Sequence, residues 1–423
     1  MSLSSAIEKQ VLAAAVDAPA PAPNKTPLHR SIHGAESEGE VEGIRARRRR
    51  FQASRFAPPE IADRVSIRRR AVYCRNIENY VGTVKVPVGI VGPLPVNGRF
   101  AEGGFMVPLA TTEATLIASY NRGAKLLTCA GGCTVRVLDQ GVSRAPGFVF
   151  AAAPEALEFA GWVESQAQAI RQTAEATTRH GRLTRMACIP EGNYAFLELL
   201  FDTRDASGQN MVTIAAQAAC DYIRACSPIR PLSVYIESNF SGDKKASLRT
   251  LHSVRGRKVS AEAVIPEAYV RAGLHTTPAE MERYYRMAAV ACSMAGTFGT
   301  QGHFANGLAA LYLACGQDVA CVAESAIGHT RLEVLPGGDL YCSVNLPGVM
   351  VATVGGGTAL HYLRDRARLK RGESVLVNGA AGAIGTNAWD GAGTNVLGLW
   401  STNGFAGFDG DQVNGIYYVA WTL

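Results

Sequence analysis

Three separated parts of the sequence carry charged side chains that could move protons or stabilise charge. Glu113 follows two threonines and precedes an apolar-periodic run. It is either a carboxylate placed against a helix dipole, with a threonine as the cap, or, if buried, a general acid. Lys244 lies in the segment from Asn239 to Lys245, which is either a solvated turn or a loop whose preorganised charge stabilises an oxyanion. Asp318 follows an expected helix from Gly302 to Gly316, where a carboxylate is unfavourable to the dipole.

Two glycine-containing segments are candidates for binding an anion. The segment from Val354 to Thr358 holds three consecutive glycines, and it either cradles a phosphate through backbone N–H groups or forms a tight turn. The segment from Asp205 to Met211 opens an expected helix, and helix N-termini favour anions. Neither segment is a Gly-x-Gly-x-x-Gly dinucleotide fingerprint, so neither identifies a ligand by itself.

The elements that would position these residues form two domains, which gives an α+β fold. Residues 148–237 predict a βαββαβ unit with strands at 148–152, 183–190, 195–202 and 233–236 and helices at 154–179 and 210–225. This order is ferredoxin-like, and its two ends lie close together, as an inserted domain requires. Residues 58–147 and 238–369 then form a larger helix-rich domain around it, in which proline and glycine make residues 84–94 a shaped loop or short strands.

Composition limits the class of protein. The chain has 423 residues, which favours two or more domains, and its 47% hydrophobic and 18% charged residues exclude a disordered chain or a coiled-coil rod. Ten cysteines occur without a Cys-x-x-Cys pair or metal-ligand spacing, so we expect reduced, buried thiols and no metal. No apolar run is long enough to cross a bilayer and no secretory signal pattern is present, so we expect a cytoplasmic protein without a membrane span.

Much of the formal charge of +6 lies near the start of the chain. Residues 1–57 include Arg45 and the run from Arg47 to Arg50, and a second arginine run covers residues 68–70. No aromatic interleaving or known binding motif accompanies these arginines. The pattern therefore favours a solvated, flexible leader over a nucleic-acid partner.

Taken together and in order, short blocks of sequence resemble hydroxymethylglutaryl-CoA reductase, between residues 65 and 358. The blocks are Val65 to Arg69, Glu78-Asn79, Pro87 to Gly89, Gly92 to Leu94, Ala110 to Glu113, Ser119 to Gly123, Arg144 to Pro146, Asp205 to Met211, Asp243 to Lys245, Gly316 to Asp318 and Gly355 to Thr358. The resemblance implies that the large domain holds a CoA thioester and that the inserted ferredoxin-like domain holds NADPH. It also implies a homodimer or dimer of dimers, with active sites shared between protomers.

The same resemblance implies a role for each matching residue. Lys244 would stabilise the thioester oxygen and then the aldehyde oxygen, Glu113 would donate a proton, and Asp318 would link the two and tune their pKa values. Residues matched to the hydroxymethylglutaryl end are Arg144, Asp243, Lys245 and Asn306. Residues matched to positions near CoA are Ser119, Asn121, Arg122 and His303. Residues matched to cofactor contacts are Asp205, Gly208, Asn210, Gly355 and Gly356. The implied reaction is the four-electron reduction of hydroxymethylglutaryl-CoA to mevalonate and CoA with two NADPH.

Two features depart from the family pattern. Glu237 stands where the family often has a serine, so one substrate contact is expected to differ. The glycine-rich tail, residues 370–423, supplies no histidine to protonate the departing CoA thiolate, and the last histidine of the chain is His361. Part of this tail, Gly372 to Gly385, looks like the glycine turn of a quinone reductase but is too short for that domain. The alternatives are therefore a catalytically impaired CoA-thioester-binding relative, or a chain whose tail prevents assembly.

Overall fold

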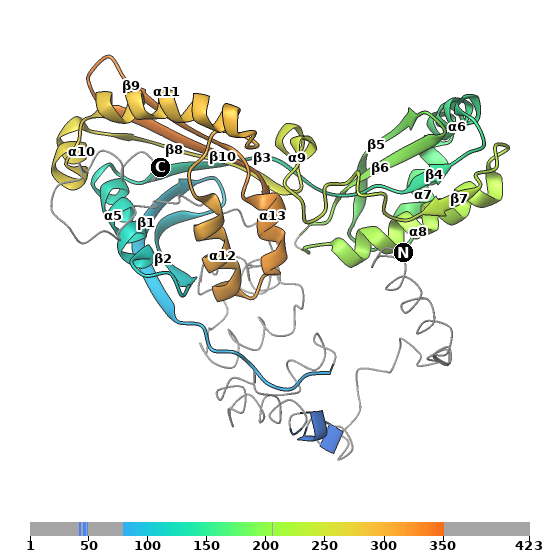
Figure 1. Ribbon diagram of the computed structural model, residues 1–423, viewed down its shortest axis with the longest axis horizontal. Coiled ribbons are helices and arrows are strands. Elements are labelled where there is room, and N and C mark those ends of the chain that lie inside the picture. The colour runs from blue at the N-terminus through green and yellow to red at the C-terminus, as the bar shows by residue number, and fades with distance from the viewer. Residues whose placement is uncertain (1–41, 44, 48, 50–78, 205, 351–423) are drawn as a thin grey trace, which may run out of the picture. The chain divides into compact units, whose positions relative to one another are not determined.

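The computed structural model describes residues 42–43, 45–47, 49, 79–204 and 206–350. It divides the chain into two compact units, Met1–Thr83 and Val84–Leu423. In the first unit, residues 42–43, 45–47 and 49 are helical, and the exposed Glu42 pairs with Arg45 at 3.6 Å and with Arg49 at 2.7 Å. The sheets and the helices listed next belong to the second unit, coloured from light blue to orange in Figure 1.

A large sheet covered by helices forms most of the second unit. Its strands are β1 (Val88–Gly98), β2 (Glu102–Ala110), β3 (Cys133–Arg144), β8 (Gly256–Ile265), β9 (His329–Val334) and β10 (Leu340–Val349). Its helices are α5 (Leu116–Cys129), α9 (Leu248–His252), α10 (Glu267–Leu274), α11 (Pro278–Ala295), α12 (Phe304–Cys315), α13 (Val322–Ser325) and the 3₁₀ turn η2 (Val319–Cys321). The strands β3, β8, β10 and β9 are neighbours in antiparallel pairs, and β1 joins β2 antiparallel and β3 parallel. The predicted helices are thus accompanied by a sheet that the sequence pattern did not predict.

Residues 84–94, predicted to be a shaped loop or short strands, lead into strand β1 and form its first part from Val88 onward. Its pairing with β2 is irregular between Val91 and Leu94, around the Gly-Pro dipeptide. The side chain of Asn121 on α5 supports this irregular part, because its Oδ1 accepts from the Gly92 N–H at 3.0 Å and its Nδ2 donates to the Ile90 carbonyl at 3.2 Å. A side-chain amide therefore satisfies backbone groups that regular strand pairing leaves open.

Helix α5 begins later than the predicted threonine cap. Its N-cap residue is Thr115, which has a left-handed backbone (φ 68°) and makes no side-chain cap. The hydroxyl of Thr111 instead accepts from the Glu113 N–H at 2.9 Å, in a local turn that precedes the helix. The cap prediction was therefore wrong, because a short-range hydroxyl–backbone bond holds this segment outside the helix.

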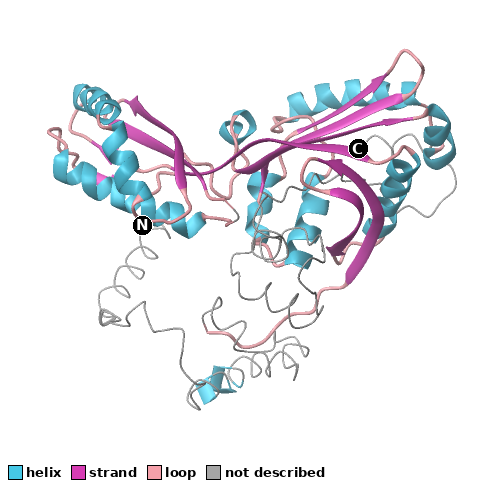
Figure 2. Ribbon diagram, turned by 180° about the vertical axis from the view of Figure 1, so that it is seen from behind, coloured by secondary structure: helices cyan, strands magenta, loops and turns pink. Residues whose placement is uncertain are grey.

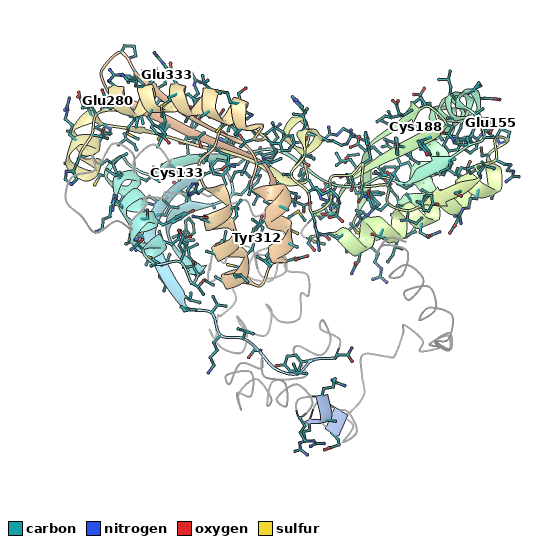
Figure 3. The ribbon with its side chains drawn as sticks, viewed as in Figure 1. Cys133, Glu155, Cys188, Glu280, Tyr312 and Glu333 are labelled. Carbon is teal, nitrogen blue, oxygen red and sulfur yellow. The ribbon has the colours of Figure 1, made fainter. Side chains whose placement is uncertain are left out.

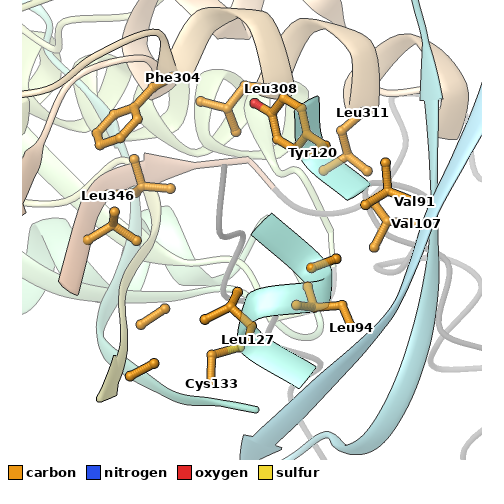
Figure 4. Packing of buried hydrophobic residues seen from close by; sticks show 14 of the residues in the cluster. Val91, Leu94, Val107, Tyr120, Leu127, Cys133, Phe304, Leu308, Leu311 and Leu346 are labelled. Carbon is orange, nitrogen blue, oxygen red and sulfur yellow. The ribbon is translucent and has the colours of Figure 1, made fainter. Parts of the chain in front are cut away.

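The apolar periodicity of α5 was predicted correctly and builds the larger core. Leu116, Tyr120 and Leu127 are all buried, and they pack with residues of β1, β2 and α12 (Figure 4). Leu308 and Leu311 approach from α12. Burial of this apolar stripe fixes the rotation of both helices, and with it the positions of the loops at their ends.

The ferredoxin-like order appears between β3 and the lysine segment. Its elements are β4 (Gly147–Val149), α6 (Ala153–Ser165), α7 (Ala167–Glu175), β5 (Arg182–Glu191), β6 (Tyr194–Asp202), α8 (Gln209–Cys226) and β7 (Ser233–Tyr235). The strand order is β7-β4-β6-β5 with every neighbouring pair antiparallel. The single helix predicted for residues 154–179 is two helices, α6 and α7, which are divided at Gln166. The domain boundaries stay a prediction.

Strand β3 connects the two sheets. Its first part pairs with β8 up to Gly141, and its last residues, Val142 to Arg144, pair with β6. Strands therefore continue from one sheet into the other, which can be followed in Figure 2. The end of β3, the exit from β7 and the start of β8 lie near one another as a result, and each of these positions carries a charged residue discussed below.

Candidate active site

The lysine loop, residues 239–245, leads out of the ferredoxin-like unit. Lys244 has a left-handed backbone with φ 54°, and its Nζ donates to Asp318 Oδ2 at 2.6 Å. This hydrogen bond is the largest cause that raises the pKa of Lys244 above its ordinary value, so the side chain stays protonated near neutral pH. With 41% of its side chain exposed, the ammonium is fixed by a partner and still reachable from solvent.

Asp318 is held in place by the backbone that follows it. Helix α12 ends at Gly316 in the left-handed conformation, and Asp318 is the N-cap of the next turn, η2. One carboxylate oxygen accepts from the Ala320 N–H at 3.0 Å, while the other accepts from Lys244. Asp318 lies just beyond the end of α12, where a carboxylate is unfavourable to the helix dipole. It is also the N-cap of η2, where a carboxylate is favourable, and this second position explains why it is accommodated.

Asp243 is the first member of a charged cluster beneath the lysine loop. Its carboxylate accepts from Arg144 Nη1 at 3.1 Å and from Arg255 Nη2 at 2.5 Å. Burial by itself would raise the pKa of Asp243, but Arg255 and Arg144 outweigh it and lower that pKa below its ordinary value. Asp243 is therefore ionised and tied to both arginines.

Glu324 and Arg255 lie deepest in this cluster, and sequence reasoning missed both. Glu324 is fully buried, and its Oε2 accepts from the Lys244 backbone N–H at 2.6 Å and from Arg255 Nε at 2.5 Å. Burial by itself would lower the pKa of Arg255, but Glu324 and Asp243 outweigh it and raise that pKa. Burial also raises the pKa of Glu324. No local sequence signal distinguishes these charged residues from solvated ones.

Arg144 is placed by two carboxylates and by the helix predicted to bind the cofactor. Its Nη1 also donates to Glu237 Oε2 at 3.2 Å, and its Nη2 donates to the Gln209 carbonyl in the first turn of α8 at 3.2 Å. The side chain of Arg144 is only 8% exposed. Glu237, the residue that departs from the family pattern, thus contacts an arginine expected to bind substrate.

Glu113 meets a different partner from the one expected. Its Oε1 accepts from Asn306 Nδ2, in the first turn of α12, at 3.4 Å. Among the described residues, the structure gives Glu113 no hydrogen bond to Lys244 or Asp318. The catalytic candidates therefore occur as two pairs, Lys244 with Asp318 and Glu113 with Asn306. The expected link through Asp318 stays a prediction.

The residues expected near CoA have varied environments. Ser119 is fully buried, and the Asn121 amide is occupied by the β1 backbone. Arg122 and His303 are partly exposed, with His303 at the N-cap of α12. Lys245, expected at the hydroxymethylglutaryl end, donates from Nζ to the Asp243 carbonyl of its own loop at 3.0 Å. Their roles toward substrate stay predictions.

The N-terminus of α8 is suited to an anionic group. Its N-cap is Gly208, whose φ is 77° and which provides no side-chain cap, while Asn210 is exposed in the first turn. The first N–H groups of an 18-residue helix are thus not covered by a capping side chain, and the dipole favours negative charge there. These residues fit a phosphate-bearing cofactor. Asp205, Gly355, Gly356 and the tail at 370–423 lie outside the described residues.

Replacing Gly208 by alanine is expected to lower the free energy of unfolding by about 1 to 2 kcal/mol for the left-handed backbone alone. A Cβ at this position would also lie 2.3 Å from Thr203 Cγ2, which adds to the loss. Urea unfolding followed by circular dichroism would measure it. The matched control is Gly161→Ala, because Gly161 is inside α6 with open space around it, and alanine should raise stability there by about 0.5 to 1 kcal/mol. Equal stability of both variants would contradict the prediction.

A pH-dependent stability contribution is expected from Asp243. Because its pKa in the folded protein lies below the ordinary 3.8, its ionised form stabilises the fold above that pH. The contribution is lost as the pH falls through the lowered value, where the folded protein also takes up the proton. The stability gap between the unmodified protein and Asp243→Asn should therefore be constant near neutral pH and shrink below pH 3.8, measured by urea unfolding. A gap that stays constant into acid would refute this.

The described cysteines are free thiols; six of the nine are buried as predicted, whereas Cys129 and Cys226 are exposed and Cys292 is partly exposed. Burial raises the pKa of Cys133 and of Cys188, both labelled in Figure 3, to about 12, so these thiols are unreactive near neutral pH.

Within residues 79–204 and 206–350 no group of three or more His, Cys, Asp or Glu side chains could hold a metal ion. In the same part of the chain, no helix has both the length and the apolar character needed to cross a membrane.

The fold and the site together define an α+β protein in which a ferredoxin-like unit joins a larger sheet beside a lysine fixed by an aspartate. Such a site is suited to stabilising negative charge on an oxygen atom. Residues 44–374 match the family model of hydroxymethylglutaryl-coenzyme A reductase. The chain belongs to this family of oxidoreductases, which reduce hydroxymethylglutaryl-CoA. The match stops at residue 374, so nearly all of the glycine-rich tail lies beyond it.

Relatives and solved structures agree with the family assignment. The chain is 42% identical over 318 residues to the 3-hydroxy-3-methylglutaryl-coenzyme A reductase of Aeropyrum pernix, covering 75% of this chain and 74% of that protein. It is 42% identical over 296 residues to the Pyrococcus horikoshii enzyme of the same name, covering 69% and 71%. The class II reductase of Streptococcus pneumoniae, solved bound to NADPH in open conformations, superposes with a TM-score of 0.57 at 19% identity, covering 82% and 93%. The last comparison bears on the fold alone.

Proposed function

We propose that the chain catalyses the four-electron reduction of (S)-3-hydroxy-3-methylglutaryl-CoA to mevalonate and CoA with two NADPH. The observation that carries this proposal is the 2.6 Å bond between Lys244 Nζ and Asp318, which holds a protonated ammonium at the site. Each hydride that adds to a carbonyl carbon leaves negative charge on the oxygen. A preorganised cation stabilises that charge without reorganising at the moment of reaction.

The atoms and electrons of the reaction are accounted for in two reductions. In the first, a hydride and a proton convert the thioester carbonyl to a hemithioacetal. The C–S bond of this intermediate then breaks to give mevaldehyde and the CoA thiolate, which takes up the proton released from the hydroxyl. In the second, a hydride adds to the aldehyde carbon and a proton to its oxygen, which gives the alcohol. Lys244 would hold the oxygen in both steps, and Glu113, placed by Asn306, would supply protons.

The remaining candidates are assigned to binding. Arg144, Asp243, Lys245 and Asn306 would hold the hydroxymethylglutaryl end. NADPH would supply the hydride when bound, with Gly208 and Asn210 at the N-terminus of α8 facing its anionic part. This choice of cofactor follows from membership of the reductase family, of which a member with the same fold, from S. pneumoniae, was solved with NADPH. The homodimer or dimer of dimers and the cytoplasmic location stay predictions.

The alternative function is a catalytically impaired relative that binds the CoA thioester. It is favoured by one observation: residues 362–423 contain no histidine that could protonate the CoA thiolate. His303, partly exposed at the start of α12, is the candidate substitute. If it serves as the acid, His303→Gln should abolish thioester reduction beyond what weaker CoA binding explains.

One experiment separates the two functions. The purified chain is incubated with NADPH and either hydroxymethylglutaryl-CoA or mevaldehyde, and NADPH oxidation and mevalonate are measured. Reduction of both supports the full reaction. Reduction of mevaldehyde alone supports the impaired relative, with the defect at thiolate protonation, since loss of one general acid costs about 10² to 10⁴ in rate. Reduction of neither, with CoA-ester binding intact, would overturn the enzymatic proposal.

A further inference from the structure

The backbone of Lys244 is attached to a buried carboxylate that the reaction above does not use. Glu324 lies on α13 and is fully buried, and it accepts the Lys244 N–H at 2.6 Å across 80 residues of sequence. Lys244 itself has a left-handed backbone, which a residue with a side chain rarely adopts. The conformation that aims its ammonium at Asp318 is thus held by a contact from outside the lysine loop.

Glu324 belongs to an alternating row of acids and bases. The row runs through Glu324, Arg255, Asp243, Arg144 and Glu237, with one contact between each neighbouring pair. Arg255 is 1% exposed, and its Nη1 also donates to the Ser143 carbonyl at the end of β3 at 2.8 Å. The row therefore joins the backbone of the lysine loop to the end of β3, where this strand pairs with β6. Through the bond from Arg144 to the Gln209 carbonyl, it also joins that loop to the first turn of α8.

The free energy of folding does not by itself explain why this row of buried charged residues is present. Burying two charges costs several kcal/mol per ion, and well-packed apolar residues in place of a buried ion pair are often as stable or more so. What apolar residues cannot do is accept the Lys244 N–H and hold both oxygens of Asp243 in one orientation. The row is therefore better explained by geometry at the site than by the free energy of folding.

We infer that Arg255 and Glu324 are positioning residues for the reduction, which fix the Lys244 backbone and the Asp243 carboxylate so that the Lys244 ammonium meets the reacting oxygen. This inference rests on the function proposed above. The side chains of Arg255 and Glu324 do not touch the substrate. Both act through Lys244 and Asp243, and a misplacement of about 1 Å at such a site can cost about 10²-fold in rate.

The kinetic test compares Glu324→Gln with Ser325→Ala in the full chain. Ser325 is the matched control because it is also fully buried on α13, yet its hydroxyl bonds to Tyr312 (labelled in Figure 3) and to the Gly348 carbonyl rather than to the lysine loop. Glu324→Gln should lower kcat by about 10- to 100-fold with the KM for NADPH within about twofold. Ser325→Ala should lose stability and keep its kcat. A kcat for Glu324→Gln within twofold of the unmodified chain, or an equal loss in both variants, overturns the inference.

A second measurement can be made whether or not the chain is catalytically active. Acetic anhydride labelling followed by peptide mass spectrometry gives the reactivity of Lys244 relative to Lys125, an exposed lysine on α5. Lys244, bonded to Asp318, should react more slowly than Lys125 in the unmodified chain, and the ratio should rise severalfold in Glu324→Gln but not in Ser325→Ala. An unchanged ratio in a folded Glu324→Gln would refute the positioning role even if the reductase function held. A raised ratio in a chain without activity would support the positioning role and count only against the function.

Arg255→Lys is the second variant, for the case in which Glu324→Gln does not fold. Lysine keeps the charge but cannot reach Glu324, Asp243 and the Ser143 carbonyl together, because it lacks the planar fork of arginine. The inference expects the same rise in Lys244 labelling and the same loss of kcat. Unchanged labelling and kcat in folded Arg255→Lys overturn it.

Discussion

Replacing Lys244 by methionine is expected to lower kcat for hydroxymethylglutaryl-CoA reduction by at least about 10² to 10³, which is the usual loss when one preorganised oxyanion donor is removed. The physical reason is that the Lys244 ammonium, paired with Asp318 at 2.6 Å, is a fixed positive charge that the proposed reaction places at the reacting oxygen. Methionine keeps a similar length and removes the charge. The loss should appear with mevaldehyde as well, because both reductions place charge on an oxygen.

The Lys244 prediction separates catalysis from folding. The Lys244 side chain is 41% exposed and its ion pair faces solvent, so methionine should leave the midpoint of thermal unfolding nearly unchanged. Lys125→Met is the matched control, because Lys125 is an exposed lysine on α5, outside the candidate site. Steady-state NADPH oxidation measures all three proteins. A Lys244→Met protein that reduces mevaldehyde at the unmodified rate would rule out the charge-stabilising role.

Replacing Arg255 by methionine is expected to lower the free energy of unfolding by about 3 to 5 kcal/mol, the usual cost of removing one partner from a buried ion pair. Arg255 is 1% exposed and contacts Glu324 and Asp243, both at 2.5 Å. Methionine fills part of the volume, but it leaves Glu324 buried without a compensating cation. Unfolding in urea would measure the change.

An exposed ion pair provides the control for Arg255. Arg185 pairs with Asp139 at 2.8 Å, but its side chain is 53% exposed, so Arg185→Met should cost less than about 1 kcal/mol. The contrast tests whether burial, rather than the presence of an ion pair, determines the cost. The prediction fails if both methionine variants unfold at the same urea concentration.

Glu237 shows how a departure from the family pattern is accommodated. Its carboxylate shares Arg144 with Asp243, and its other oxygen accepts the Asn239 N–H at the start of the lysine loop at 2.8 Å. The residue thus supports the loop as well as the arginine. A serine side chain is too short to span both contacts, so Glu237 makes a connection in this chain that a serine could not make.

The sequence by itself determined the family, the α+β class and the order of elements in the ferredoxin-like unit. These features depend on short windows of sequence, such as the apolar period of α5 or the turn between β5 and β6, where the pattern and the structure it produces lie within a few residues. Two local features of the helices were predicted wrongly. The expected cap of α5 failed because the Thr111 hydroxyl accepts from the nearby Glu113 N–H in a turn before the helix, and the helix expected before β5 is divided at Gln166.

Apart from the contact between Lys244 and Asp318, which the family resemblance implied, only the tertiary structure decided which charged residues meet. Lys244 and Asp318 are 74 residues apart in sequence, and Arg255 and the Ser143 carbonyl are 112 apart, so no local pattern could pair them. The burial of Glu324 is likewise a product of packing, since a glutamate in a short helix is ordinarily solvated. Sequence therefore identified the lysine and the aspartate as candidates. The buried acids and bases that hold them became visible only once β3, β8 and α13 were brought together, because burial and charge pairing are properties of the folded chain.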